Sequence, residues 1–154
     1  MSASEHLYTI DMEWEGDHTR TYEEYTREHT VRINGKLDLI ATADPMFRGD
    51  ATQHNPEDLL LAALSGCHLL TYLALCARAR IDVKRYNDRA SGTLVLTKDG
   101  GGQFSEVVLR PQVIVADPSM IEKARAFHAE VHKYCFIARS VNFPVRCEAS
   151  VRVA

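Results

Sequence analysis

One apolar segment constrains the fold of this chain more than any other feature. Residues 55–79 read NPEDLLLAALSGCHLLTYLALCARA, with no charged side chain between Leu59 and Ala77. About 18 to 20 apolar residues are long enough to cross a bilayer, but Ser65 and His68 interrupt this run and polar sequence flanks it. A helix that is apolar on all sides can also be the central helix of a folded core. We therefore expect a core helix and no membrane span.

The ends of this helix are marked by ordinary capping signals. Asn55 is a good N-cap residue, and Pro56 suits the first helical position. Glu57 and Asp58 place negative charge at the positive end of the helix dipole. Basic residues gather near Arg80, where we expect the helix to end.

Length and charge limit the classes of function. A chain of 154 residues is expected to form one domain, 1–154, with a core large enough to fold unaided. Its formal net charge is −3 and no basic cluster stands out, which argues against a nucleic-acid partner. The first residues, MSASEHLYTIDMEWEG, do not have the pattern of a signal peptide. We expect a cytoplasmic protein, in which cysteines are buried, metal-bound or catalytic rather than structurally bridged.

The segment before the helix has the pattern of antiparallel strands. Tyr8, Ile10, Met12 and Trp14 alternate with polar residues, which predicts a strand with one buried face. Further on, Asn34-Gly35 lies between two β-like runs and predicts a tight hairpin. The first forty residues are therefore expected to form a small β-meander.

The segment after the helix mixes strands with a second helix. Residues 90–115 predict two strands joined by a glycine-rich turn, and Asp117-Pro118 opens a helix that continues to Tyr134. Residues 145–153, VRCEASVRV, alternate cleanly and predict one final strand. The fold class expected is α+β: meander, long buried helix, hairpin, second helix and last strand.

The four cysteines differ in their surroundings. Cys76 and Cys147 lie on apolar faces and are interpreted as core residues. Cys135 follows the second helix, where the backbone can bring its thiol up to another element. His128, His132 and Cys135 share a helical face that could hold zinc, but no fourth ligand is evident and we expect no metal or other cofactor.

Cys67 stands in the middle of the apolar helix, and the sequence around it resembles a known family. The block NPEDLLLAALSGCHLLTYLAL, with ADPMFRGD before it and CFIARSV well after it, is similar to the OsmC/Ohr family of osmotically inducible and organic-hydroperoxide-resistance proteins. His68 directly after the cysteine is closer to the OsmC-like branch than to the Ohr branch. The resemblance covers most of the chain and implies an intertwined homodimer with its sites at the interface.

The resemblance also implies the roles of particular residues. Cys67 corresponds to the peroxidatic cysteine and Cys135 to the resolving cysteine of the family. A glutamate and an arginine assist them, and Glu57 matches the glutamate. Arg48, in FRGD, best matches the OsmC-type arginine; Arg27 and Arg20 are the alternatives if the arginine comes from the meander.

The implied activity is the dithiol-dependent reduction of small organic hydroperoxides. A thiolate attacks a peroxide oxygen, and an arginine can hold the thiol ionised and bind the peroxide oxygens. In Ohr relatives lipoylated proteins supply the reducing dithiol, which the resemblance implies here as well. The alternative is a non-catalytic OsmC-like module that binds a ligand or senses redox change in response to stress.

The spacing of Glu57 and Cys67 has a consequence of its own. Ten residues of straight helix separate them by about 15 Å along the axis, which no pair of side chains can span. Glu57 can therefore assist only the Cys67 of another chain, and this also favours a homodimer.

Overall fold

The computed structural model describes residues 3–154. Residue contacts divide the chain into two compact units, one ending at Leu59 and the other spanning Leu60–Ala154. The prediction of a single domain, 1–154, stays a prediction.

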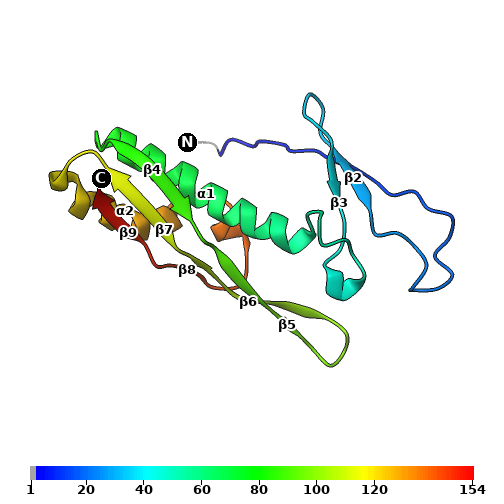
Figure 1. Cartoon of the computed structure of the whole chain (residues 1–154). Helices are drawn as coiled ribbons and strands as arrows, with labels where there is room; N and C mark the ends of the chain where they lie inside the picture. Colours follow the sequence, from blue (N-terminus) through cyan, green and yellow to red (C-terminus); the bar gives the residue numbers. More distant parts are fainter. Residues whose placement is uncertain (1–2) are drawn as a thin grey trace. The chain divides into compact units, whose positions relative to one another are not determined.

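Figure 1 shows the elements in chain order. The strands are β1 (Asp11–Glu13), β2 (His29–Arg32), β3 (Leu39–Ala41), β4 (Val83–Asp88), β5 (Ser91–Leu96), β6 (Gly102–Leu109), β7 (Pro111–Val115), β8 (Val145–Cys147) and β9 (Ser150–Val153). The α-helices are α1 (Pro56–Arg78) and α2 (Ile121–Glu130), and the 3-10 helices are η1 (Pro45–Phe47), η2 (Pro118–Met120), η3 (Val131–Lys133) and η4 (Ala138–Ser140).

The N-terminal unit contains the predicted meander. Strands β1, β2 and β3 pair antiparallel in that order. The hairpin between β2 and β3 turns at Asn34-Gly35, where Gly35 has φ +77° and the Lys36 N–H donates to the Ile33 carbonyl at 3.0 Å. Glycine is needed there because L-residues with side chains rarely adopt a positive φ.

The first strand differs from the prediction in length and burial. It is only three residues long and none of them is buried. The alternating apolar side chains of this segment, Tyr8 to Trp14, are exposed, and Tyr8 is 89% exposed. The alternation is present in the sequence, but the apolar side chains it places on one face are exposed in the described part of the chain.

The helix α1 begins as predicted. The Asn55 Oδ1 accepts a hydrogen bond from the Asp58 N–H at 2.9 Å, and the Asn55 N–H donates back to an Asp58 carboxylate oxygen at 3.3 Å. This reciprocal pair satisfies two N–H groups that a helix start otherwise leaves free.

The same helix ends two residues before the predicted position. Arg80 has φ +57°, and its N–H donates to the Ala77 carbonyl at 3.1 Å, while the Ile81 N–H donates to the Cys76 carbonyl at 2.9 Å. These two hydrogen bonds are the Schellman motif, and Ile81 and Cys76 also share a core cluster.

The C-terminal unit is built on one long bent hairpin. Strand β5 pairs with β6 and, beyond a break at Arg110, β4 pairs with β7, so residues 83–115 run out and back as a ribbon (Figure 1). The glycine-rich turn over 97–101 joins its arms, as predicted. Residues 90–115 were predicted to form two strands but form three, β5, β6 and β7, because the return arm passes from one sheet to another at Arg110. Strand β4 was not predicted.

The last strand is also divided where the ribbon bends. Strand β8 pairs parallel with β6, and β9 pairs parallel with β7. The predicted alternation persists across the division, with Cys147, Ala149 and Val151 less exposed than their neighbours.

A single polar side chain joins the bend to α1. Asp88, at the end of β4, accepts hydrogen bonds from the Ser65 hydroxyl at 2.6 Å and from the Arg110 N–H at 2.6 Å. The polar interruption of the apolar helix at Ser65 therefore has a structural partner.

Two apolar clusters fill the C-terminal unit. One unites Tyr72 and Cys76 of α1 with Val113, Val115 and Val151 of the sheet and with Ala124, Val131 and Cys135 beyond it. The other packs Leu64 against Phe104, Val107 and Leu109.

By length and composition α1 is a helix that could cross a membrane, and it is the single one in the part of the chain described here. Its polar residues point to a core helix instead, because Ser65 and His68 both make hydrogen bonds to other elements of the C-terminal unit.

Candidate functional site

The structure brings Cys67 and Cys135 together. Cys67 lies on α1, eleven residues into the helix, and is half-buried, whereas Cys135 is only 1% exposed. Cys67 packs against the apolar cluster that contains Cys135, and it lies near enough to affect the pKa of that thiol. All four cysteines of the chain are free thiols in this structure.

Cys135 is held by the backbone that follows α2. Its N–H donates to the Val131 carbonyl at 2.8 Å, and its carbonyl accepts from the Arg139 N–H at 3.1 Å. Two short 3-10 helices, η3 and η4, flank it and turn the chain back toward α1. The sequence prediction that this thiol could be brought up to another element is confirmed.

The surroundings of Cys135 keep its thiol protonated. Burial and the neighbouring Cys67 raise the pKa of Cys135 to about 11, although N–H groups of residues 137 and 138 act in the opposite direction. A buried thiol resists ionisation because the thiolate loses its hydration. Cys135 is therefore suited to react second, after an electrophilic sulfur has formed beside it.

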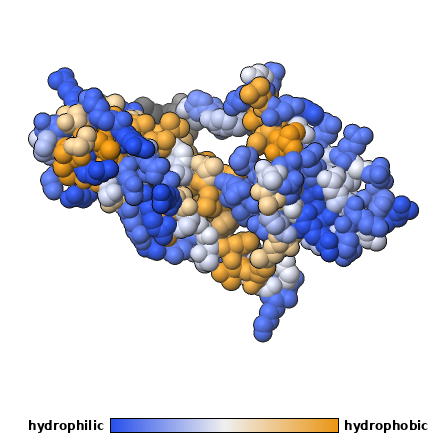
Figure 2. Space-filling view, in the orientation of Figure 1, coloured by the Kyte–Doolittle hydropathy of each residue, from blue (hydrophilic) through white to orange (hydrophobic). Residues whose placement is uncertain are grey.

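A largely apolar groove lies beside the segment that holds Cys135. Its volume is about 430 Å³, and its lining includes Leu70 and Ala74 of α1 and Tyr134 and Phe136 on either side of Cys135. The basic side chains Arg78, Lys133 and Arg139 also line it, and neither Cys67 nor Cys135 does. Leu70 is 69% exposed and Phe136 is 78% exposed. Figure 2 shows hydrophobic residues reaching the surface along α1. Such a surface suits an apolar ligand or a second protein chain.

Glu57 and the three candidate arginines belong to the N-terminal unit. Glu57 is half-buried in the first turn of α1. Arg48 ends η1 with φ +66° and lies 3.9 Å from a carboxylate oxygen of Glu23. Next to it, a Cβ on Gly49 would lie 1.5 Å from the Ala43 carbonyl oxygen, so only glycine fits after Arg48.

Two of the candidate arginines share one aromatic neighbour. The Arg27 guanidinium lies over the rings of Tyr25 and Tyr22, at 3.7 and 4.6 Å, and donates to both of their carbonyls. Arg48 lies 5.8 Å from the same Tyr22 ring. Arg20 is exposed and has no comparable contact among residues 3–154. Within their unit, Arg27 and Arg48 thus form one cationic region around Tyr22.

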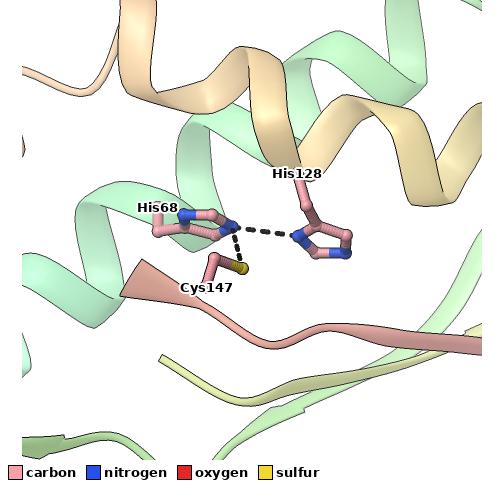
Figure 3. Close-up of side chains that lie close together, drawn as sticks. All are labelled: His68, His128 and Cys147. Carbon is pink, nitrogen blue, oxygen red and sulfur yellow. Dashed lines mark hydrogen bonds between the residues drawn. The ribbon is translucent and has the colours of Figure 1, made fainter. Parts of the chain in front are cut away.

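A second group of reactive side chains was not predicted. The imidazoles of His68 and His128 approach with Nε2 and Nδ1 3.0 Å apart, and the Cys147 Sγ lies 3.8 Å from the same His68 nitrogen. Figure 3 shows them converging from α1, α2 and β8. The trio that helical spacing offered as a possible metal site, His128, His132 and Cys135, is not the group that the fold brings together among residues 3–154, since Cys135 lies in the apolar core cluster.

The structure confirms the predicted burial of Cys76 but not that of Cys147. Cys76 is 1% exposed within the core, as predicted. Cys147 was expected in the core as well, but it is half-buried and lines a surface pocket with His128 and His132. Strand alternation identified its inward face correctly; it could not show that the neighbours on that face are imidazoles contributed by two helices.

Comparison with known proteins establishes the family. Residues 49–150, about two-thirds of the chain, match the family model of the OsmC-like proteins. The chain belongs to this family. It is 31% identical to an OsmC-like protein of unknown function from Vibrio cholerae, with a TM-score of 0.82 over 92% of this chain and 97% of that one.

More distant family members have the same fold. An organic hydroperoxide resistance protein OsmC from Legionella pneumophila has a TM-score of 0.70 at 21% identity and covers 97% of this chain and 100% of its own. The organic hydroperoxide resistance protein OhrB of Bacillus subtilis has a TM-score of 0.63 at 19% identity, covering 94% and 98%. The uncharacterized protein YmaD of Bacillus subtilis is 23% identical over 125 residues, 78% of this chain and 83% of its own. The predicted α+β, OsmC/Ohr-like fold is confirmed.

Proposed function

We propose that this OsmC-like protein is a thiol peroxidase that reduces small organic hydroperoxides in the cytoplasm. The observation that carries the proposal is the pairing of the half-buried Cys67 with the buried Cys135. Two cysteines of one chain, distant in sequence and close in the fold, provide an attacking thiol and a resolving thiol. Relatives of the same fold that are named organic hydroperoxide resistance proteins support the choice of substrate class.

The reaction proceeds in three steps: oxidation of Cys67, disulfide formation and reduction of the disulfide. The Cys67 thiolate attacks the peroxide oxygen, the O–O bond breaks, and the alkoxide leaves and takes up a proton, so that sulfenic acid and alcohol are formed. The Cys135 sulfur then displaces water from the sulfenic acid and forms a disulfide. An external dithiol, for which a lipoylated protein is the proposed source, reduces the disulfide and is itself oxidised.

The apolar groove beside the pair gives the site its preference for organic substrates. Leu70 lies one helical turn after Cys67, and Tyr134 and Phe136 flank Cys135 in the chain; all three present hydrocarbon or aromatic surface. An alkyl or aryl group gains free energy from covering such a surface, and hydrogen peroxide has no such group.

We further propose that the working unit is a homodimer. On the continuous helix α1, ten residues separate Glu57 from Cys67, about 15 Å along the axis, so each Glu57 would serve the partner's thiol. The exposed apolar side chains of α1, and the stripe from Tyr8 to Trp14, provide surface for that contact. Glu57 would orient an arginine, Arg48 or its neighbour Arg27, toward the substrate oxygens.

The activity is tested with purified protein, cumene hydroperoxide and a dithiol. Cys67→Ser should lower turnover by at least about 1,000-fold, since the serine hydroxyl is not ionised and does not attack peroxides. Cys76→Ser, which changes a buried thiol elsewhere on the same helix, should retain it. Absence of turnover in the wild-type protein, or equal turnover in both variants, would support the non-catalytic binding or redox-sensing module instead.

The arginine is identified by three single substitutions. Replacing the arginine that binds the peroxide oxygens should reduce kcat/KM by about 100- to 1,000-fold, as loss of one charge-stabilising donor typically does. We expect this for Arg48→Ala, a smaller loss for Arg27→Ala, and none for Arg20→Ala. An unchanged rate in all three variants would remove arginine from the mechanism.

A further inference from the structure

We propose that His68, His128 and Cys147 form a binding site for a zinc ion. The three potential ligand atoms, two imidazole nitrogens and one sulfur, all lie within 4.8 Å of one another. Two nitrogens and a sulfur are ligands that zinc prefers in proteins. The inference is independent of the proposed peroxidase activity, which does not use any of these three residues.

Two of the three distances between the ligand atoms are close to those of tetrahedral coordination. With Zn–N bonds of about 2.0 Å and Zn–S bonds of about 2.3 Å, neighbouring nitrogens lie about 3.3 Å apart and nitrogen and sulfur about 3.6 Å. The observed separations are 3.0 Å between the histidine nitrogens and 3.8 Å between Cys147 and His68. The His128 nitrogen and the Cys147 sulfur lie within 4.8 Å of each other, so these side chains would move closer by up to about 1 Å when one ion binds all three ligands.

The pKa values of the two histidines are shifted by burial. Burial, with smaller effects of His132 on His68 and of His68 on His128, lowers the pKa of His68 to about 4 and that of His128 to about 3. Burial therefore disfavours the charged form of both rings. One of the two facing nitrogens carries the proton of their hydrogen bond, and binding of an ion would move that proton to the other nitrogen of the same ring.

The Cys147 thiol has to lose its proton when the ion binds. Burial raises the pKa of Cys147 to about 11, and Asp88 and Glu148 add to this effect. Zinc replaces that proton directly: the S–H bond breaks, an S–Zn bond forms, and one proton is released to solvent for each ion bound.

Hydrogen bonding alone does not satisfy this cluster. Among the residues described, the His128 Nε2 is buried and has no hydrogen-bond partner, whereas Nδ1, the nitrogen proposed as the ligand, is paired with His68. The Tyr72 ring stacks on His128 at 4.0 Å between centroids and holds its plane without using a nitrogen. A pair of buried imidazoles kept for packing alone would be expected to have both nitrogens of each ring satisfied.

The cluster is open to solvent on one side. A pocket of about 380 Å³ is lined by His128, His132 and Cys147, with Arg125, Ala129 and Ala149 around them. The charge of Arg125 is offset by Glu122, at 3.4 Å. The pocket provides a path for the ion and space for a water molecule as the fourth ligand, the arrangement of open zinc sites.

The ligands belong to three separate elements of the C-terminal unit. His68 lies on α1, His128 on α2 and Cys147 on β8. A bound ion would tie these elements together and raise the thermal stability of the protein, because the unfolded chain does not hold the ligands in place.

The site is tested by titrating metal-free protein with Co²⁺, which substitutes for Zn²⁺ and reports thiolate ligands through a sulfur-to-cobalt charge-transfer band. We expect one ion per chain, displaced by Zn²⁺. Affinity should fall by at least about 100-fold in Cys147→Ser and in His128→Gln. Cys76→Ser and His132→Gln should bind as the wild-type protein does. Absence of the band, or equal binding in Cys147→Ser, would overturn the proposal.

A second measurement uses only the wild-type protein, so it does not depend on whether a variant folds. In the wild-type protein, Zn²⁺ should protect Cys147 from iodoacetamide, as followed by mass spectrometry, and leave the labelling rate of Cys67 unchanged. If Cys147 is labelled at the same rate with and without Zn²⁺, the zinc site does not exist.

Discussion

Two faces of the helix α1 differ in what they contact. Leu64, His68, Tyr72 and Cys76 recur at every fourth residue, and all four are buried in the C-terminal unit. On the neighbouring face, Cys67 and Ala74 are half-buried and Leu70 is exposed. Both faces are apolar in sequence. One of them stabilises the chain, while the other remains available for a reactive thiol, a substrate and a partner chain.

The largest effect expected on stability comes from the buried face. Leu64→Ala should lower the free energy of unfolding by about 2–5 kcal/mol, because the residue is fully buried among Phe104, Val107 and Leu109 and leaves a cavity there. Denaturant unfolding at fixed protein concentration measures this. The matched substitution on the other face, Leu70→Ala, should lower the free energy of unfolding of the chain by less than about 1 kcal/mol. Equal losses would mean that the two faces do not differ as described.

A charge on the exposed face tests the proposed dimer. Leu70→Glu should weaken dimerisation by at least about 100-fold, since the contact would bury a carboxylate without a partner. Analytical ultracentrifugation gives the dissociation constant, and circular dichroism shows whether the fold is kept. Leu94→Glu, which changes an exposed leucine on strand β5 and not on α1, is the control and should leave the association unchanged. A wild-type protein that sediments as a monomer would contradict the proposal.

A smaller effect is expected from pH on the resolving step. The pKa of Cys135 is raised to about 11, so the fraction of its thiolate increases with pH throughout the neutral range. Disulfide formation after a single addition of hydroperoxide should accelerate by up to about tenfold per pH unit, in proportion to that fraction. Rapid-mixing measurements of the loss of Cys67 sulfenic acid would follow it. A rate independent of pH would show that proton removal from Cys135 does not limit this step.

The smallest effect on stability is expected from the N-terminal cap of α1, which belongs to neither face. Asn55→Ala removes the side chain that caps α1 and should cost about 1 kcal/mol of stability. Asn55→Asp, which retains an acceptor for the Asp58 N–H, is the control and should cost less. A loss of several kcal/mol would mean that Asn55 does more than cap the helix.

Much of the fold could be predicted because local chemistry determines it. Asn55 and Pro56 start α1, Gly35 closes the first hairpin, and Asp117 begins the turn before α2, with its side chain accepting from the Ser119 N–H at 2.8 Å. The division of the ribbon at Arg110 was missed because a strand can change partners without any break in its alternation.

The sites were predictable to different extents. The Cys67 and Cys135 pair followed from a resemblance, and the fold packs Cys67 against the apolar cluster that contains Cys135. The group of His68, His128 and Cys147 was not predicted, since its members come from three elements and no sequence spacing connects them. The burial of the segment from Tyr8 to Trp14 was predicted from alternation, but alternation does not tell whether the cover belongs to the same chain.

The most direct test of the proposed function is to identify the product of a single oxidation. Wild-type protein is treated with one equivalent of cumene hydroperoxide per chain, its remaining thiols are alkylated, and the non-reduced digest is analysed by mass spectrometry. We predict a disulfide that joins Cys67 to Cys135, with Cys76 and Cys147 recovered as alkylated thiols. Recovery of Cys67 as an alkylated thiol, or its disulfide with any other cysteine, would contradict the proposed function.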